Sequence, residues 1–293
     1  MSQENILKVE NLVMHFGGIK ALNDVTFDIK RGSVSALIGP NGAGKTTVFN
    51  CLTGFYKATG GNIMLSANNK ETSVIKVLGE PFKGTDFISP VAFFQRLKYK
   101  MFGGSHLVNR AGLSRTFQNI RLFKEMSVVE NLLVAQHMRV NRNLLGGILN
   151  TKAYQLAEEE ALERAFYWLG VVDLVDFANR LAGELSYGQQ RRLEIARAMC
   201  TNPEIVCLDE PAAGLNPSET EALTKMIRVL RDQHKTTVLL IEHDMGMVMD
   251  ISDYIVVLDH GEVIADGGPD DIKSNPKVIA AYLGAEEGEE VTL

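Results

Sequence analysis

The sequence is poor in cysteine and has no long hydrophobic run. Its 293 residues include only three cysteines, Cys51, Cys200 and Cys207. Their spacing fits neither a disulfide framework nor a zinc site, so we expect them to be small core residues. The longest strongly apolar runs, such as 238–241 and 255–258, have the length of β-strands. A bilayer helix needs about 20 apolar residues, so the sequence predicts no membrane span.

An excess of positive charge is also missing. The chain has 30 Lys and Arg against 36 Asp and Glu, a formal net charge of -6. This charge is a poor match for a long polyanion, so we expect no nucleic-acid partner. Residues 1–10 mix charged and apolar side chains and lack a signal-peptide core, which predicts that the chain stays in the cytosol. With 45% hydrophobic and 23% charged residues, the composition is that of a folded globular protein.

A glycine-rich segment follows the third of three predicted strands, which span residues 6–13, 25–29 and 33–38. It fits G-x-x-x-x-G-K-[ST] and runs into a predicted helix. Glycines there let backbone N–H groups turn toward phosphate oxygens, while Lys45 would reach the β- and γ-phosphates and Thr46 would bind Mg²⁺. The sequence therefore predicts a phosphate loop formed by Gly39, Pro40, Asn41, Gly42, Ala43, Gly44, Lys45, Thr46 and Thr47.

Two acidic residues follow a second apolar run. Residues 205–208 are continuously apolar and end at Asp209 and Glu210, which is typical of a parallel strand buried on both faces. Asp209 would hold Mg²⁺ through water, and Glu210 would polarise the attacking water in phosphoryl transfer. Taken alone, the pair could equally be two surface carboxylates at the end of a strand.

A third motif decides between these alternatives. Residues 185–190, Leu-Ser-Tyr-Gly-Gln-Gln, precede an amphipathic helix over 191–200. Here the chain resembles the ATP-binding cassette (ABC) family, whose LSGGQ signature matches except that Tyr187 replaces the first glycine. The resemblance implies that ATP and Mg²⁺ are bound and that two cassettes pack head to tail. In that dimer, Ser186, Gly188 and Gln189 of one cassette cap the γ-phosphate held by the other.

Further positions match the family in order. Gln118 resembles the Q-loop glutamine, which contacts Mg²⁺ and water and faces the transmembrane partner. His243 resembles the switch histidine that contacts the γ-phosphate. Phe16 occupies the place of an aromatic that stacks on adenine, although it could equally be a core side chain. Asn216 stands where many members have Asp, and the order Asn216, Pro217, Glu219 favours helix capping as its main role, while a role in cross-dimer communication stays open. On the helix that follows, the spacing predicts one packed face formed by Ala222, Leu223, Met226, Ile227 and Leu230.

Longer strings, at 115–123, 187–197, 209–217 and 280–284, are similar to the high-affinity branched-chain amino acid transport ATP-binding subunits. The resemblance covers most of residues 5–284. It implies a bacterial importer with two permease subunits, a second ATPase subunit and a substrate-binding protein, with this chain peripheral on the cytoplasmic side of the membrane. Urea or amides remain alternative solutes. A soluble ABC protein of translation or repair is a rival, and a P-loop GTPase is disfavoured because the guanine motif NKxD is missing.

The expected fold is α/β, with a P-loop NTPase (RecA-like) core, an N-terminal antiparallel β-subdomain and a helical subdomain at about 128–188. One cassette domain spans 5–268, followed by a helical extension at 269–284 and an acidic, disordered tail at 285–293. Residues 67–110 are predicted to be an irregular insertion with one short helix near 91–101. Its aromatic and basic side chains either pack on the β-subdomain or contact a permease or lipid headgroups; they are Phe93, Phe94, Arg96, Lys98, Tyr99, Lys100 and Phe102. On either alternative, we expect that replacing residues 69–104 with a short Gly/Ser linker leaves a folded chain that still binds ATP, because the cost of loop closure changes slowly with length.

Overall fold

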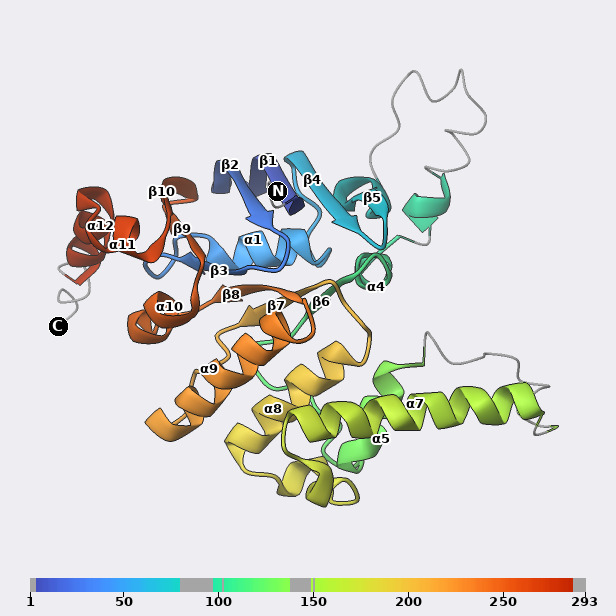
Figure 1. Ribbon diagram of the computed structural model, residues 1–293. Helices are drawn as coiled ribbons and strands as arrows, with labels where there is room; N and C mark the ends of the chain where they lie inside the picture. Colours follow the sequence, from blue (N-terminus) through green and yellow to red (C-terminus); the bar gives the residue numbers. More distant parts are fainter. Residues whose placement is uncertain (1–3, 80–96, 102, 138–148, 150, 287–293) are drawn as a thin grey trace.

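The computed structural model describes residues 4–79, 97–101, 103–137, 149 and 151–286. Its strands form two sheets (Figure 1). The smaller one is antiparallel, with the order β2-β1-β4-β5. These strands are β1 (Asn5–Phe16), β2 (Ile19–Lys30), β4 (Gly60–Ala67) and β5 (Lys70–Ser73). The N-terminal antiparallel β-subdomain is therefore present as predicted.

The larger sheet has six strands in the order β10-β9-β3-β8-β7-β6. Neighbours from β9 to β6 are parallel, and β10 pairs antiparallel with β9 at the edge. Every residue of β3, β7 and β8 is buried, because helices and the smaller sheet cover both faces. This confirms the predicted α/β fold. The strands are β3 (Val34–Ile38), β6 (Leu113–Arg115), β7 (Ile205–Asp209), β8 (Thr237–Ile241), β9 (Tyr254–Asp259) and β10 (Glu262–Gly267).

The helices lie on both sides of the larger sheet and in a separate group below it in Figure 1. Those of the first half are α1 (Lys45–Leu52), α2 (Val74–Val77), α4 (Ser105–Arg110) and α5 (Val128–Ala135). Those of the second half are α7 (Lys152–Val171), α8 (Tyr187–Met199), α9 (Pro217–Asp232), α10 (Met245–Ile251), α11 (Pro269–Lys273) and α12 (Pro276–Glu286). Short 3₁₀ turns occur at Val175–Phe177 and Ala182–Glu184. Among the described residues, no helix combines the length and hydrophobicity needed to cross a bilayer.

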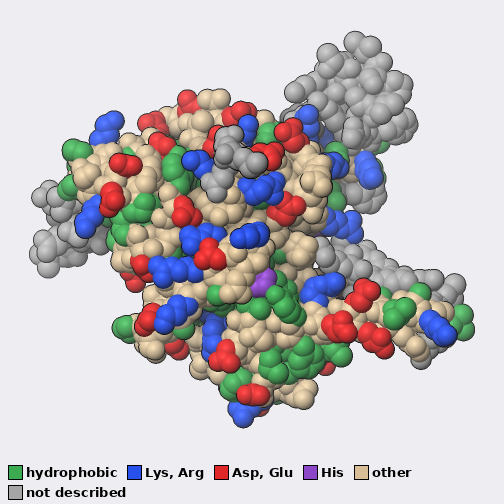
Figure 2. Space-filling model, in the orientation of Figure 1, with side chains coloured by type: hydrophobic (Ala, Val, Ile, Leu, Met, Phe, Trp, Pro, Cys, Tyr) green, Lys and Arg blue, Asp and Glu red, His purple; other side chains and the backbone are tan. Residues whose placement is uncertain are grey.

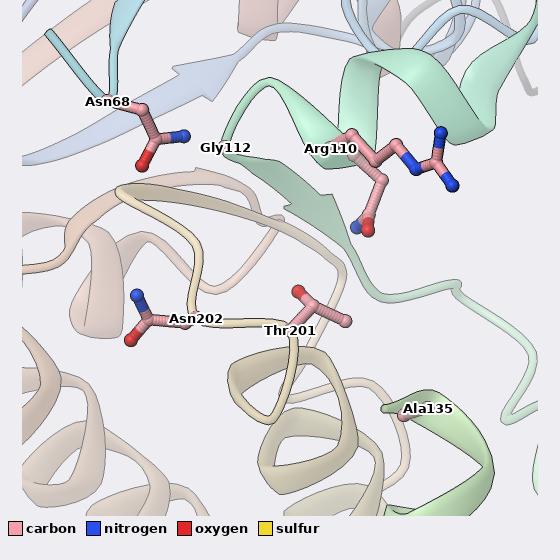
Figure 3. Close-up of a pocket in the computed structure, with 7 residues that line it drawn as sticks. Asn68, Arg110, Gly112, Ala135, Thr201 and Asn202 are labelled. Atoms are coloured by element: carbon pink, nitrogen blue, oxygen red, sulfur yellow. The ribbon is translucent and has the colours of Figure 1, made fainter. Parts of the chain in front are cut away.

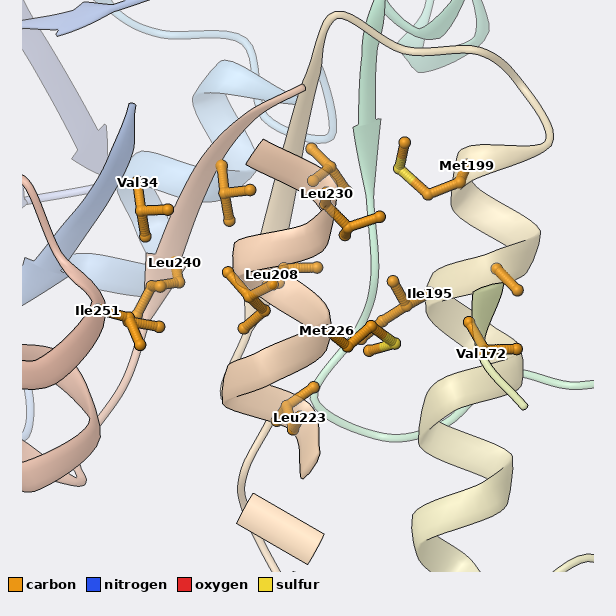
Figure 4. Packing of buried hydrophobic residues seen from close by; sticks show 14 of the residues in the cluster. Val34, Val172, Ile195, Met199, Leu208, Leu223, Met226, Leu230, Leu240 and Ile251 are labelled. Atoms are coloured by element: carbon orange, nitrogen blue, oxygen red, sulfur yellow. The ribbon is translucent and has the colours of Figure 1, made fainter. Parts of the chain in front are cut away.

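Two hydrophobic clusters form the core, one on each face of the larger sheet. Along β7, Val206 and Leu208 belong to the cluster under α8, α9 and α10, whereas Ile205 and Cys207 belong to the cluster shared with α1 and the smaller sheet. Figure 4 shows the first cluster, in which Leu208 and Leu240 of the sheet face Leu223, Met226 and Leu230 of α9. All three cysteines are buried, as expected, and burial raises the pKa of the Cys51 thiol to about 12.

The helical subdomain consists of α5, α7 and the connection into α8. A capping box at Ser127 begins α5: its hydroxyl accepts from the Glu130 N–H, and the Glu130 carboxylate accepts from the Ser127 N–H. Asn131 is fully buried and satisfies backbone groups of the preceding loop. Figure 1 shows α7 extending away from the sheets. Residues 287–293 of the expected acidic tail lie outside the described residues, and 285 and 286 end α12.

The described part of the insertion is not irregular. Asn68 and Asn69, both with positive φ (52° and 55°), form the two-residue turn of a hairpin that pairs β5 with β4. After β5, α2 and α4 bury Val74 and Val108 in the core shared with α1. Residues 97–101 are helical. Residues 91–96 of the predicted helix, and with them Phe93, Phe94 and Arg96, lie outside the described residues, as does Phe102.

This integration has a measurable consequence for stability. Val74→Ala should lower the free energy of unfolding by about 2 kcal/mol, because Val74 is fully buried and two methyl-sized groups are lost from a packed site. Lys76→Ala, two residues further along α2 and exposed, is the matched control and should change the free energy of unfolding by less than about 0.5 kcal/mol. Urea unfolding of the purified chain measures both. Equal stability of the two variants would restore the interpretation of residues 67–110 as an appendage.

Candidate nucleotide-binding site

The phosphate loop, residues 39–47, connects the carboxyl end of β3 to α1. At two positions of the loop, only glycine fits the backbone conformation and the space available. Gly39 has φ 149°, and a Cβ there would stand 2.0 Å from the Leu258 carbonyl oxygen. Gly44 is the N-cap of α1 with φ 102°, and its Cβ would crowd Leu22 and the Ala21 carbonyl. The glycine spacing is therefore required by the close packing of the loop against β9 and β2.

Lys45 lies within the curve of this loop and is 6% exposed. Its ammonium group donates to the carbonyl oxygens of Gly39 (2.7 Å) and Pro40 (2.9 Å). Burial lowers the pKa of Lys45, and the negative charge of Glu210 opposes that shift. Phosphate oxygens are stronger partners for an ammonium group than carbonyls are. Asn41, Gly42 and Thr46 are exposed, so the first turn of α1 is open to a ligand.

Three neighbouring parallel strands bring the catalytic candidates together. The strands β6, β7 and β8 lead into the segments that carry Gln118, Glu210 and His243. The Glu210 carboxylate accepts a hydrogen bond from Gln118 Nε2 (2.6 Å) and shares a second one with His243 Nε2 (2.9 Å). Glu210 adopts a positive φ of 47°, an unfavourable conformation for a non-glycine residue, and its N–H donates to the Ile241 carbonyl (3.0 Å). The structure thus joins three residues that the sequence placed far apart.

Glu242 links the two loops on either side of this carboxylate. Its Oε1 accepts from the Ala212 N–H (2.6 Å), just after Glu210, and its Oε2 accepts from the His243 N–H (3.0 Å). Glu242 is buried, and burial raises the pKa of its carboxyl group. Nothing in the sequence analysis pointed to this residue. The only feature of the sequence that could have indicated a role for Glu242 is its position between a predicted strand and His243.

A buried ion pair holds Asp209. Arg115 Nη2 lies 2.6 Å from Asp209 Oδ2, and the side chains are 6% and 5% exposed. Arg115 also donates to Asn50 Oδ1 (2.6 Å) and Thr53 Oγ1 (3.2 Å) at the end of α1. The pair therefore ties β6 and β7 to the helix that follows the phosphate loop. The sequence identified Asp209 but missed Arg115, whose signal is a charge on a strand expected to be buried.

The signature residues lie at the start of α8 instead of at the phosphate loop of their own chain. Ser186 is the N-cap: its hydroxyl accepts from the Gln189 N–H (3.3 Å), and Gln189 Oε1 accepts from the Ser186 N–H (3.0 Å). A Cβ at Gly188 would stand 2.5 Å from Glu219 Oε1, so α8 and α9 approach closely. Tyr187, the departure from the motif, packs its ring against Gly214. Its hydroxyl accepts a hydrogen bond from Arg191 (3.2 Å).

Two buried charges on α8 hold the backbone around Gln118. Arg191, fully buried, donates to the carbonyl oxygens of Phe117 and Gln118, each at 2.8 Å. Glu194 Oε1 accepts from the N–H groups of Phe117 (3.4 Å) and Arg121 (3.3 Å). Burial raises the pKa of Glu194, and the Arg191 charge opposes this. The helix that begins with the signature therefore fixes the Gln118 segment, a link that the sequence analysis did not anticipate.

The structure shows that Phe16 is exposed and that Asn216 caps a helix. Phe16, at the end of β1, is 43% exposed and makes an edge-to-face contact with Tyr56, with 5.3 Å between ring centroids. It is therefore not a core side chain, and Tyr56 is a second exposed aromatic that the sequence analysis missed. Asn216 forms a capping box with Glu219 at the start of α9, as predicted. On that helix Ala222, predicted to be buried, is exposed, and Thr224 is buried instead.

Comparison with known proteins now decides the family. The profile of the ABC transporter family matches residues 22–213. The chain belongs to the ABC transporter family. A second profile, described as branched-chain amino acid ATP-binding cassette transporter, matches residues 262–288. BraF of Pseudomonas aeruginosa, a high-affinity branched-chain amino acid transport ATP-binding protein, is 53% identical over 95% of this chain and 98% of its own.

Solved ABC cassettes share the fold. The ADP conformation of MJ1267, an ATP-binding cassette of an ABC transporter, has a TM-score of 0.72 at 33% identity, covering 96% of this chain and 99% of that one. A dimeric post-hydrolysis structure of the cassette MJ0796, bound to ADP and Pi, has a TM-score of 0.64 at 25% identity, covering 90% and 98%. The predicted P-loop NTPase fold of this ABC cassette is thereby confirmed.

The side chains of the cassette suit Mg²⁺ held together with phosphates. Thr46, Asp209 and Gln118 offer hydroxyl, carboxylate and amide oxygens, the ligand type that Mg²⁺ prefers. Among the described residues, no group of three His, Cys, Asp or Glu side chains could form a closed metal cage.

A cavity with a volume of about 260 Å³ lies apart from the phosphate loop and the catalytic candidates. Figure 3 shows its lining, which includes Asn68, Arg110, Gly112 and Asn202. It lies near the amino ends of β6 and β7, whereas the phosphate loop, Glu210 and His243 follow the carboxyl ends of their strands. The cavity is therefore distinct from the candidate nucleotide site.

The buried ion pair of the cassette can be tested directly. Arg115→Met should lower the free energy of unfolding by about 3 kcal/mol, because Asp209 would remain buried without its charge partner. Adding Asp209→Asn to that variant should recover part of the loss. Arg228→Met, which breaks the exposed pair with Asp250, is the control and should cost less than about 1 kcal/mol. Strictly additive effects of the Arg115 and Asp209 substitutions would contradict the pairing.

Proposed function

We propose that this chain is the ATP-binding and ATP-hydrolysing subunit of an ABC importer that takes up branched-chain amino acids. The observation that carries the activity is the Glu210 carboxylate, oriented by Gln118 and His243 at the strand ends next to the phosphate loop. The 53% identity to BraF over nearly the full length of both chains supports the solute class. Urea or an amide is the alternative solute, because the permeases and the binding protein select what is carried.

Each site residue has a defined task in hydrolysis. The backbone of residues 39–47 and the Lys45 ammonium group bind the phosphates of ATP, and Phe16 with Tyr56 offers an aromatic surface to adenine. Thr46, Asp209 and Gln118 would hold Mg²⁺, which neutralises phosphate charge when bound. Glu210 accepts the proton of the attacking water, and His243 and Gln118 hold the carboxylate in position.

Two permease subunits and a second ATPase subunit are the partners in this proposal, with a substrate-binding protein acting indirectly. The exposed position of Ser186 at the N-terminus of α8, with Gly188 and Gln189 in the first turn, supports a head-to-tail dimer in which these residues bind the nucleotide of the other subunit. Figure 2 shows hydrophobic side chains gathered over the helical subdomain, where Leu162 and Phe166 of α7 are exposed. This surface supports a peripheral location on the cytoplasmic side of the membrane, against the permeases.

Glu210→Gln tests the base. The amide is nearly isosteric with the carboxylate but cannot take a proton, so ATP binding should persist while hydrolysis falls by roughly 10²- to 10⁴-fold. Phosphate release by the assembled transporter measures the rate. Glu221→Gln, an exposed carboxylate on α9 paired with Lys225, is the matched control and should leave the rate unchanged. Near-normal hydrolysis by the Glu210→Gln complex would remove Glu210 from this role.

Lys45→Ala and Ser186→Ala separate binding within one subunit from binding across the dimer. Lys45→Ala should weaken ATP binding by the isolated chain, because the phosphates lose their charged partner. Ser186→Ala should spare that binding and reduce hydrolysis by the assembled transporter.

The control for Ser186→Ala must share its structural cost. Ser127→Ala removes the same kind of capping-box hydroxyl from α5, and each loss should cost about 1 kcal/mol of stability. Equal loss of hydrolysis in the two serine variants would mean that Ser186 acts only as a helix cap.

A further inference from the structure

Tyr187, the residue that departs from the family signature, makes two contacts that a glycine could not make. Its ring lies so close to Gly214 that a Cβ placed on that glycine would stand 3.2 Å from the ring carbon Cε1. Its hydroxyl accepts a hydrogen bond from Arg191 Nη2 at 3.2 Å. Gly214 and Arg191 both belong to segments that contact or carry Glu210, so the departure from the signature changes the surroundings of the proposed base.

Gly214 lies on the short segment that connects Glu210 to α9. Two hydrogen-bonded turns shape this segment. The Ala213 N–H donates to the Glu210 carbonyl (3.2 Å), and the next turn is closed by the Leu215 N–H, which donates to the Ala212 carbonyl (3.0 Å). Gly214 has a φ of 78°, in the left-handed region that favours glycine. The tyrosine ring therefore supports a tightly turned segment that begins at the proposed base.

Arg191 connects the Tyr187 hydroxyl to the other side of Glu210. The Nη2 atom that donates to Tyr187 also donates to the Gln118 carbonyl (2.8 Å). The Gln118 side chain in turn donates to the Glu210 carboxylate (2.6 Å). Arg191 is fully buried, and its Nε has no hydrogen-bond partner in the part of the chain that the structure describes. The direction of its guanidinium group therefore depends on the bonds that its two Nη atoms donate.

These contacts form a closed circuit around the proposed base. It runs from Glu210 through Gln118 and Arg191 to Tyr187, and it returns through Gly214 and the two turns of the segment that begins at Glu210. The side chain of Tyr187 supplies two of the links. A glycine at this position would leave the Arg191 branch and the Gly214 branch unconnected.

We propose that Tyr187 is a positioning residue that connects the start of the signature helix to Glu210 of the same subunit. This rests on the proposed function, because it takes Glu210 to be the base of ATP hydrolysis and Ser186 to bind the nucleotide of the other subunit. Ser186 is exposed and caps α8, and Tyr187 is the first residue of that helix. Engagement of Ser186 with the second nucleotide therefore reaches Glu210 through the two contacts of Tyr187.

Tyr187→Phe is the first test, because it keeps the ring against Gly214 and removes the bond from Arg191. The kcat for ATP hydrolysis by the assembled transporter should fall about three- to tenfold, the effect expected for one hydrogen bond. The KM for ATP should stay within about twofold. The Kd of the isolated chain for MgATP, measured by titration calorimetry, should be unchanged, because the signature lies away from the phosphate loop of its own chain.

Tyr187→Gly separates this role from a role confined to the signature. The variant restores the residue of the LSGGQ motif and removes both contacts of Tyr187. If the motif alone mattered, the variant would be as active as the unaltered chain. We expect a larger fall in kcat than in Tyr187→Phe. Urea unfolding checks that the glycine variant is folded, and the Tyr187→Phe result stands by itself if it is not.

A double-mutant cycle tests the route through Arg191. Without the Gln118 side chain, the position of the Gln118 backbone no longer affects Glu210 through that hydrogen bond. In a Gln118→Ala chain, Tyr187→Phe should therefore change kcat by less than about twofold. A residue that only stabilised α8 would have the same effect in both backgrounds.

Tyr254→Phe is the matched control. Tyr254 lies on β9, and its hydroxyl donates to Asp266 on the edge strand β10. This variant also loses one tyrosine hydrogen bond, but away from α8, so its kcat should equal that of the unaltered transporter.

Four outcomes would overturn the proposal. They are an unchanged kcat in the Tyr187→Phe transporter, full activity of a folded Tyr187→Gly transporter, the same fold-loss from Tyr187→Phe with and without the Gln118 side chain, and an equal loss in Tyr254→Phe. Failure of the unaltered transporter to hydrolyse ATP is a separate result, and it would reject the proposed function itself.

Discussion

Glu210 accepts hydrogen bonds from Gln118 and His243, and this arrangement depends on the order of the strands. In the sequence β3-β8-β7-β6 across the sheet, the phosphate loop, His243, Glu210 and Gln118 each follow a different parallel strand. Their carboxyl ends share one edge, so residues up to 204 positions apart along the chain meet at one place. The positive φ of Glu210 and the bridging carboxylate of Glu242 show how closely the loops are held there.

Buried charges make this edge rigid. Arg115 binds Asp209 and the end of α1, and Arg191 with Glu194 fixes the backbone on both sides of Gln118. Removing Arg115 would leave Asp209 buried without its charge partner, which is costly in a low-dielectric interior. Removing Arg191 would leave the buried Glu194 carboxylate with Arg197 alone, at 4.0 Å. Because Arg191 and Glu194 lie on the helix that begins at Ser186, a shift of α8 would also move Gln118. The signature and the Q-loop are thus mechanically linked within one subunit.

Most of the features that the sequence predicted correctly depend on patterns among neighbouring residues. The phosphate loop, the cap at Asn216 and the strand that ends in Asp209 and Glu210 all depend on neighbouring residues, and each lies where it was expected. The resemblance added Gln118 and His243, whose contact with Glu210 spans 92 and 33 positions. The contacts of Arg115 with Asp209 and of Arg191 with Phe117 also join residues that are far apart in the sequence. No pattern among neighbouring residues predicts them. On α9, helical periodicity found Leu223 and Met226 but misplaced the edge of the buried face at Ala222.

Residues 67–110 show a second limit of prediction from the sequence, because tertiary pairing decides their structure. Strand β5 consists of Lys70, Glu71, Thr72 and Ser73, which have no apolar alternation, so only pairing with β4 makes them a strand. The Asn68–Asn69 turn was the available signal, since both residues tolerate positive φ. The order of the fold in this region therefore comes from tertiary contacts more than from local preference.

The most direct measurement of the central claim is a crystal structure of the Glu210→Gln chain grown with MgATP. The account predicts that the phosphates lie against the backbone of residues 39–47 with Lys45 Nζ on the terminal phosphate. A water should stand between that phosphate and the side chain at position 210, and Ser186 of a second subunit should face the same phosphate. A nucleotide bound in the cavity near Asn68 and Arg110, or a water held by a side chain other than that of residue 210, would contradict the account.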